Sequence, residues 1–115
     1  MAIYMGLDSS TQSLTAVVIE VDGQSRKVLE QRSIRFDEEL VSYGCRNGVL
    51  ANSDPLVAHS NPLMWAEALD RLFEDLSRKG NFPIGELQAI AGSGQQHGSV
   101  YLNADAVTRL AALDP

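Results

Sequence analysis

The feature that most constrains the fold is an almost unbroken apolar, largely β-branched run over residues 14–21, which ends directly in Asp22-Gly23. Branched side chains fit a pleated strand, and an Asp-Gly pair tolerates the positive φ angles of a tight hairpin turn. Apolar residues also alternate over 3–7 and over 28–36, as they do in half-buried strands. The sequence therefore predicts an opening three-strand antiparallel meander. The inner face of its third strand is expected to carry Val28, Ile34 and Phe36.

A helix and a fourth strand are expected after an irregular excursion over residues 37–60, where Gly, Asn, Ser and Asp are scattered without periodicity. Asn61-Pro62 offers a helix cap followed by proline at the first helical position, and Gly80 ends the helix. A buried strand is expected over 87–91, because a helix between strands makes a crossover onto a sheet. The apolar face of the helix is expected to comprise Trp65, Leu69, Leu72, Phe73 and Leu76.

The last stretch, "ADAVTRLAALDP", begins a helical pattern that stops almost at once. A chain of 115 residues with 44% apolar residues can bury one modest core. Antiparallel strands, then a helix, then a further strand match part of a larger layered unit better than a finished domain. We therefore expect an α/β fold with a mixed sheet that is only the incomplete first part of a domain.

Charge and cysteine content exclude several classes of protein. The net charge is -6, which repels nucleic-acid phosphates and anionic membranes, so no nucleic-acid or membrane partner is expected. Cys45 is the only cysteine, so neither an internal disulfide nor a cysteine-cluster zinc site can form. The first residues lack the pattern of a signal peptide, and Glu20 interrupts the longest apolar run. We expect a cytoplasmic protein.

A polar turn, "GLDSSTQSLT", joins the first two predicted strands over residues 6–15. Its backbone N–H groups and hydroxyls can converge on an anion, and Asp8 at the strand end is placed to hold a hydrated Mg²⁺. The alternative is that Asp8 and Ser9 only make local Asx- and Ser-type turn bonds, which such runs often do. Composition alone leaves both interpretations open.

A second polar stretch, "GSGQQHGS", follows the fourth predicted strand over residues 92–99. Its glycines allow a ligand to approach the backbone, and its amide and imidazole groups match the hydroxyls of a neutral polyol. Gln95 is expected to pack inward, because consecutive strand residues face opposite ways. The alternative is a structural histidine, His97, within a solvated turn. Trp65 could line the same site or belong to the core.

Three separated stretches resemble the FGGY carbohydrate kinases and the wider superfamily of sugar kinases, actin and heat-shock ATPases. "GLDSSTQSLTAVV" resembles the first phosphate-binding hairpin of that superfamily, with serine at Ser10 for the usual glycine and Thr15 where many relatives carry a basic residue. "NPLMWAEALD" is similar to a helix start of the FGGY family, and "AIAGSGQQHGSVY" resembles its sugar-site strand. Together the three span most of residues 3–102, and they look most like the eukaryotic-type members.

The resemblance implies a ribonuclease H-like (actin-like ATPase) fold with two such domains, of which residues 1–115 would be the partial, sugar-binding first one. It implies ATP with Mg²⁺, transfer of the γ-phosphoryl group to a sugar hydroxyl, and a catalytic aspartate beyond Pro115. The C-terminal ATPase domain would lie outside this chain, so the chain alone should be inactive. The implied site residues are Asp8 for the metal, Thr11, Gln12 and Ser13 for the phosphates, and Gln96 and His97 for the sugar.

Several alternatives stay open at this point. The resemblance to the eukaryotic-type members implies D-xylulose as the sugar. Another sugar, such as ribulose or gluconate, or a non-catalytic sugar- or phosphate-sensing module would share the same stretches. Tyr43 and Cys45 have no companion catalytic group at a recognisable spacing, and Glu38-Glu39 is expected to be solvated surface charge. The unfinished sheet is expected to expose an apolar face or a free edge through which the chain self-associates.

Overall fold

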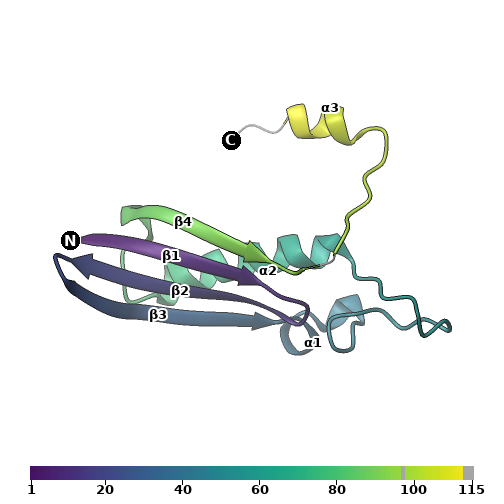
Figure 1. The fold of residues 1–115 in the computed structure, drawn as a ribbon, viewed down its shortest axis with the longest axis horizontal. Coiled ribbons are helices and arrows are strands. Elements are labelled where there is room, and N and C mark those ends of the chain that lie inside the picture. Colours follow the sequence, from purple (N-terminus) through teal and green to yellow (C-terminus); the bar gives the residue numbers. More distant parts are fainter. Residues whose placement is uncertain (97, 113–115) are drawn as a thin grey trace.

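The computed structural model describes residues 1–96 and 98–112. Its single sheet has the strand order β3-β2-β1-β4, with β1 antiparallel to β2, β2 antiparallel to β3, and β1 parallel to β4 (Figure 1). The protein is therefore an α/β fold with a mixed sheet, as predicted. The strands are β1 (Ala2–Ser9), β2 (Ser13–Asp22), β3 (Ser25–Arg35) and β4 (Leu87–Gly94), and the helices are α1 (Phe36–Glu39), η1 (Val41–Tyr43), α2 (Pro62–Lys79), η2 (Ile84–Glu86) and α3 (Ala106–Ala111).

The predicted meander is confirmed, and its strands run longer than the apolar patterns alone indicated. β2 ends at Asp22, which pairs with Ser25, so the turn between β2 and β3 is Gly23-Gln24, one residue later than predicted. Gly23 has the positive φ of +56° that the Asp-Gly signal predicted, whereas Asp22 stays in the strand. The inner face of the meander is apolar because every second side chain points toward the helix layer. Its buried members are Ile3, Met5, Leu14, Ala16, Val18 and Ile34.

The prediction for Val28 is wrong, because β3 contains a bulge. Val18 pairs with Glu30 but the next residue, Ile19, pairs with Val28, so Leu29 is an extra residue on β3. One extra residue reverses the alternation of side chains along a strand. Val28 is accordingly 59% exposed, and Leu29 packs against the core instead.

Helix α2 covers one face of the sheet and packs against β2 and β3. The Asn61 side chain caps it by accepting a hydrogen bond from the Leu63 N–H at 3.0 Å, and Gly80 ends it, as predicted. The predicted apolar face is only partly right: Leu69 is 40% exposed, and Trp65 and Phe73 flank the contact. The contact itself follows the i, i+4 ridge, whose members are Met64, Ala68, Leu72 and Leu76.

The excursion over 37–60 is more ordered than predicted, because it begins with α1 and η1. Further on, the Asp37 carboxylate accepts hydrogen bonds from the N–H groups of Asn47 (2.6 Å) and Gly48 (3.2 Å). Gly48 has a φ of +79°, and a Cβ there would lie 1.8 Å from the Thr11 carbonyl oxygen. Only glycine fits this turn, so the excursion is seated against the β1–β2 hairpin.

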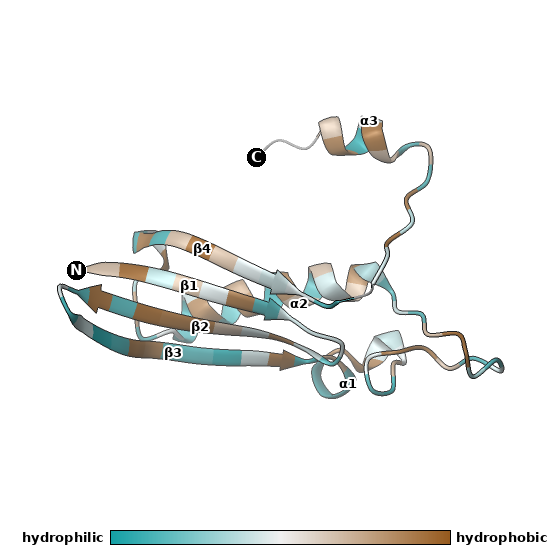
Figure 2. Ribbon diagram, in the orientation of Figure 1, coloured by the Kyte–Doolittle hydropathy of each residue, from teal (hydrophilic) through white to brown (hydrophobic). Residues whose placement is uncertain are grey.

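Strand β4 is not the buried strand that was predicted. It extends to Gly94, pairs only with β1 within the described residues, and is exposed along almost its whole length, with Ile90 50% exposed. The face of the sheet opposite α2 is also open, and β2 consists largely of hydrophobic residues (Figure 2). An open hollow of about 340 Å³ lies on that face, lined by Tyr4, Met5, Gly6, Val17, Ile19 and Ala91.

Residues 98–112 run away from the sheet before forming α3 (Figure 1). The radius of gyration is 16.6 Å, whereas a compact chain of this length would have about 13 Å. No helix within residues 1–96 and 98–112 combines the length and hydrophobicity that a bilayer crossing requires.

Candidate functional site

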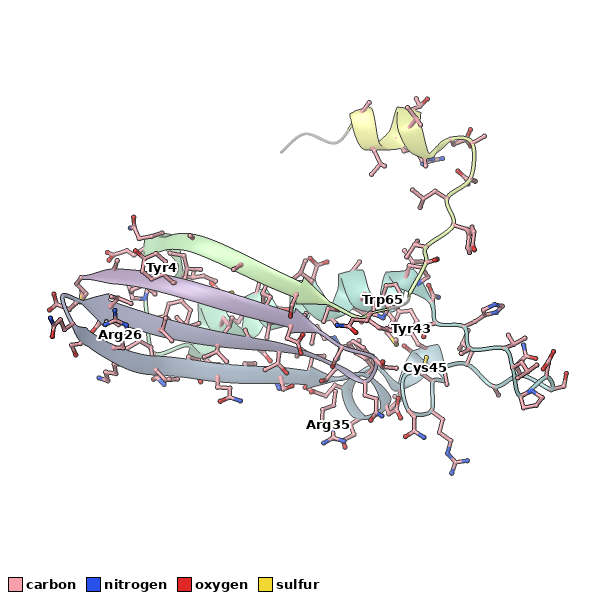
Figure 3. The ribbon with its side chains drawn as sticks, viewed as in Figure 1. Tyr4, Arg26, Arg35, Tyr43, Cys45 and Trp65 are labelled. Atoms are coloured by element: carbon pink, nitrogen blue, oxygen red, sulfur yellow. The ribbon has the colours of Figure 1, made fainter. Side chains whose placement is uncertain are left out.

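The two polar stretches of the sequence meet at one end of the sheet. β1 and β4 are parallel neighbours, so their carboxyl ends lie at the same edge, and Ser9 pairs with Gly94. The first turn of α2 reaches this end and brings Trp65 to it (Figure 3). Together these elements line a cavity of about 170 Å³ that is open to solvent. Its described lining residues are Ser9, Trp65, Gln95, Gly98, Ser99 and Val100.

Asp8 is exposed on the open face of the sheet, and it directly precedes Ser9, which lines this cavity. The Ser93 hydroxyl donates a hydrogen bond of 2.7 Å to its Oδ1 atom, and the two residues are paired in the β1–β4 register. Ser93 belongs to the second polar stretch, but nothing in the sequence assigned it this role, because only the parallel register brings it to Asp8. The bond holds the carboxylate in one orientation.

A row of polar side chains crosses the sheet beside Asp8. Asp8 pairs with Thr15, which pairs with Ser33, and the Thr15 and Ser33 hydroxyls are 2.7 Å apart in a hydrogen bond. Together with Ser93, one polar residue from each of the four strands therefore lies in this row. Thr15 carries no positive charge, so its part here is a cross-strand hydrogen bond.

The hairpin over residues 10–13 is held largely by its own serines. The Ser10 N–H and hydroxyl both donate to the Ser13 carbonyl, at 2.9 and 3.1 Å, so local turn bonds are present but are made by Ser10 rather than by Asp8 and Ser9. The Gln12 carbonyl accepts from the Phe36 N–H at 3.0 Å, and Thr11 is backed by Gly48. A hollow of about 290 Å³ adjoins the hairpin, lined by Gln12, Ser13, Ser33 and Arg35.

The second polar stretch differs from the prediction at Gln95. Its side chain does not pack inward but is exposed and lines the cavity, since β4 has no covering layer that would bury it. Gln96 is exposed in the same turn. His97 lies outside the described residues.

The chemistry of the site fits a hydrated cation better than a dehydrated one. Within residues 1–96 and 98–112, no three His, Cys, Asp or Glu side chains gather into a metal-binding cluster. Asp8 is a single oriented carboxylate, and Mg²⁺ commonly keeps several waters and binds through one or two carboxylates plus substrate phosphates. Asp8 therefore fits Mg²⁺ as one ligand, with the others supplied by water and a phosphorylated ligand.

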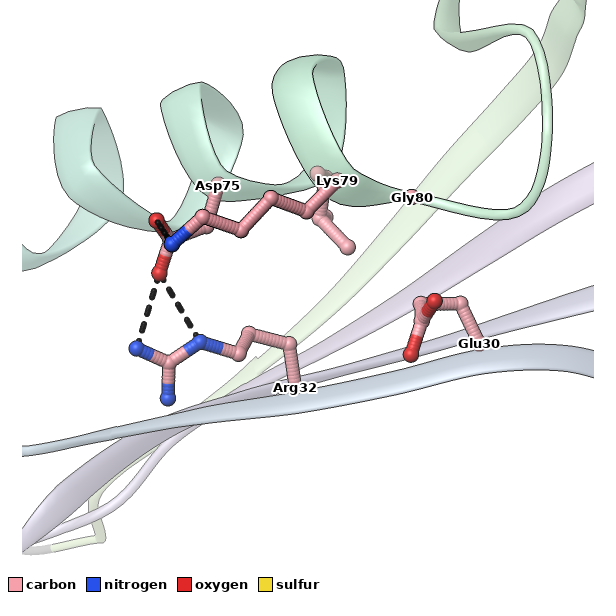
Figure 4. Close-up of a pocket in the computed structure, with 6 residues that line it drawn as sticks. Glu30, Arg32, Asp75, Lys79 and Gly80 are labelled. Atoms are coloured by element: carbon pink, nitrogen blue, oxygen red, sulfur yellow. Dashed lines mark hydrogen bonds and ion pairs between the residues drawn. The ribbon is translucent and has the colours of Figure 1, made fainter.

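The prediction that Glu38-Glu39 is solvated surface charge is wrong for Glu39. Arg32 on β3 donates to Asp75 of α2 at 2.9 Å (Figure 4). It also donates to Glu39 of α1 at 2.6 Å, so it ties both helices to the sheet. Partial burial acts to raise the pKa of Glu39, but hydrogen bonds from Arg32 and from the Arg35 N–H outweigh it and hold this pKa below its usual value. The hydrogen bond from Arg32 likewise lowers the pKa of Asp75.

The side chains of Tyr43 and Cys45 are also explained by structural contacts rather than by catalysis. The Tyr43 hydroxyl donates to the Glu67 carboxylate at 2.6 Å, and this hydrogen bond raises the pKa of Tyr43. Burial raises the pKa of the free Cys45 thiol, with a further contribution from Asp37, so the thiol is less reactive than an exposed one. Neither group lines the cavity beside Trp65.

No family model matches the sequence. It is, however, 36% identical over 111 residues to the xylulose kinase of Rattus norvegicus, a match that covers 96% of this chain and 20% of that protein. It is 39% identical over 113 residues to the xylulose kinase of Schizosaccharomyces pombe, covering 97% of this chain and 19% of that protein. Xylulose kinase 2 of Arabidopsis thaliana is 35% identical over 114 residues, covering 98% and 20%. The chain thus spans about a fifth of the length of the curated relatives it matches.

Proposed function

We propose, since this chain belongs to the xylulose kinase family of carbohydrate kinases, that the whole protein transfers the γ-phosphoryl group of ATP to D-xylulose and gives D-xylulose 5-phosphate. The observation that carries the proposal is the similarity to xylulose kinases of animals, plants and fungi over 96% or more of the chain. Similarity to proteins named xylulose kinase does not favour the alternatives, which are a ribulose or gluconate kinase and a sensing module. A cytoplasmic location is part of the proposal, and the free thiol of Cys45 is compatible with it.

The chain contributes the sugar-binding half of a first domain with a ribonuclease H-like fold, and an ATPase domain follows in the whole protein. The strand order, the apolar open face of the sheet and the exposed edge of β4 support this, because such surfaces are normally covered within a finished domain. The catalytic base lies beyond Pro115. We therefore expect residues 1–115 alone to bind ligand without turnover.

Asp8 is the proposed ligand for Mg²⁺, and Thr11, Gln12 and Ser13 form the proposed phosphate turn. When bound, the ion neutralises charge that develops on the transferred phosphoryl group. Ser93 fixes the orientation of the Asp8 carboxylate through its hydrogen bond. The seating of the hairpin against Gly48 and the Phe36 N–H keeps its backbone in place, so little reorganisation is needed when phosphates arrive.

Gln96 and His97 are the proposed contacts to the sugar hydroxyls. Their place in the sequence supports this, because Gln96 directly follows Gln95, which lines the cavity beside Trp65, and His97 is the next residue. Amide and imidazole groups both donate and accept hydrogen bonds, which suits a polyol whose hydroxyls do the same.

Two substitutions in the whole protein test these roles. His97→Ala should raise the KM for D-xylulose by the equivalent of ~1–3 kcal/mol with little change in the KM for ATP, because a sugar hydroxyl loses its buried partner. The control is His59→Ala, which removes the chain's other histidine from the loop before α2. Should His97→Ala lower the melting temperature while every ketose keeps its wild-type KM, the turn is structural and the sugar assignment is wrong.

Asp8→Ala should lower kcat by on the order of 10²-fold, because charge neutralisation matters most in the transition state. Asp70→Ala, at an exposed position on α2, is the matched control for loss of one carboxylate. An unchanged kcat at saturating Mg²⁺ would remove Asp8 from the site.

A further inference from the structure

The Trp65 side chain has two environments, one against the core and one in the cavity at the ends of β1 and β4. Packing against the core explains only the first. One part of the half-buried side chain packs against the core, and the side chain also forms a wall of the 170 Å³ cavity at the ends of β1 and β4. Polar residues from two other segments line the same cavity, Ser9 from β1 and Gln95 and Ser99 from the segment after β4. An aromatic wall together with several hydroxyl and amide groups matches a ligand with an apolar C–H side and a hydroxylated side.

The size and charge of the cavity narrow the ligand further. Pockets for drug-sized ligands have volumes of roughly 300–1,000 Å³, so about 170 Å³ suits a much smaller molecule. The described lining residues, Ser9, Trp65, Gln95, Gly98, Ser99 and Val100, carry no ionisable side chain. The described part of the lining is therefore suited to a small, neutral, polar ligand.

We propose that Trp65 is a specificity-determining residue that stacks on the C–H side of a neutral, five-carbon-sized polyol, while Gln95, Ser9 and Ser99 bind its hydroxyls. This inference rests on the proposed function, which it deepens by assigning the residues that select the sugar. It predicts that a small neutral ketose such as D-xylulose is accepted. Gln95 acts here alongside Gln96 and His97.

Trp65 is the only tryptophan of the chain, so its fluorescence reports directly on this cavity. Titration of the 115-residue chain with D-xylulose should give a saturable change in emission. Gln95→Ala should shift this titration to higher concentration. No response of the wild-type chain, or an unchanged titration of Gln95→Ala, would overturn the inference.

A matched pair of variants separates stacking from packing. Trp65→Leu should weaken D-xylulose binding roughly tenfold by calorimetry, which corresponds to about 1.4 kcal/mol of lost aromatic contact. Phe73→Leu makes the same kind of change two turns along α2 at a half-buried side chain that does not line the cavity, and should leave the dissociation constant unchanged. If both variants bind alike, Trp65 is only a core residue.

Failure of this inference is distinguishable from failure of the proposed function. Kinase activity of the whole protein with a KM sensitive to His97→Ala, but insensitive to Trp65→Leu, would refute the role of Trp65 and leave the sugar kinase intact. Absence of ketose-dependent ATP turnover would instead refute the proposed function.

Discussion

The two edge strands of the sheet have opposite environments. β3 is covered by α2 on one face, and Arg32 joins it to Glu39 and Asp75 through hydrogen bonds. β4 is exposed along nearly its whole length, and the segment after it leaves the sheet. The difference shows that the meander and α2 form the stable part of the chain, while the proposed sugar site is built at the boundary with its least supported strand.

The largest expected effect comes from the covered side. Leu72 is fully buried between α2 and the sheet, so Leu72→Ala should lower the free energy of unfolding by about 2–5 kcal/mol through lost transfer energy and a cavity. Ile90→Ala, on half-exposed β4, should cost less than about 1 kcal/mol. Urea denaturation of both variants measures the difference, and equal losses would mean that β4 is buried in solution.

The junction between the excursion and the hairpin is the next most sensitive place. Gly48→Ala should cost about 2–3 kcal/mol, because it combines a strained φ with a Cβ that meets the Thr11 carbonyl. Gly44→Ala has a similar φ of +68° but open space around its Cβ, so it should cost only about 1 kcal/mol. Similar melting temperatures for the two variants would show that the contact with Thr11 is not maintained.

The ion pairs at β3 should make the covered side sensitive to acid. The pKa values of Glu39 and Asp75 are lowered in the folded state, so their contribution is complete above the ordinary carboxyl pKa of about 4. This contribution to stability is lost as the pH falls through the lowered pKa values. The same carboxyl groups have higher pKa values in the unfolded chain, which therefore binds protons at a higher pH and is favoured by acid. We expect the two carboxylates to contribute about 1 kcal/mol to the free energy of unfolding, since both groups are partly solvated.

Arg32→Met should reduce this acid-dependent loss, which denaturant titrations at several pH values below 5 would measure. Arg26→Met, at the far exposed end of β3, is the control. An unchanged pH dependence in Arg32→Met would mean that Arg32 does not set the carboxyl pKa values.

The smallest expected effect on stability is at the free edge. We expect the chain to self-associate through β4 and the open sheet face, and Ile90→Lys should reduce association while changing stability by no more than about 0.5 kcal/mol. Light scattering over a range of protein concentrations measures the association. A wild-type chain that stays monomeric at high concentration would contradict the expectation.

The local elements were largely determined by the sequence itself. The apolar run before Asp22-Gly23 set the meander, and Asn61-Pro62 and Gly80 set the ends of α2, because strand propensity, turn geometry and helix capping each depend on a few neighbouring residues. The two polar stretches and their end-of-strand positions were likewise visible in the sequence.

Burial and contacts between distant segments were decided only by the tertiary structure. A bulge at Leu29 turned Val28 outward, the position of α2 over β2 and β3 left β4 and Gln95 exposed, and the parallel register brought Ser93 to Asp8 across 85 residues of sequence. The hydrogen bonds of Arg32 with Glu39 and Asp75 likewise depend on how the strands and helices are arranged. The physical reason is that a side chain's partner depends on which strands and helices are neighbours, and that choice minimises the free energy of the whole chain rather than of any one segment.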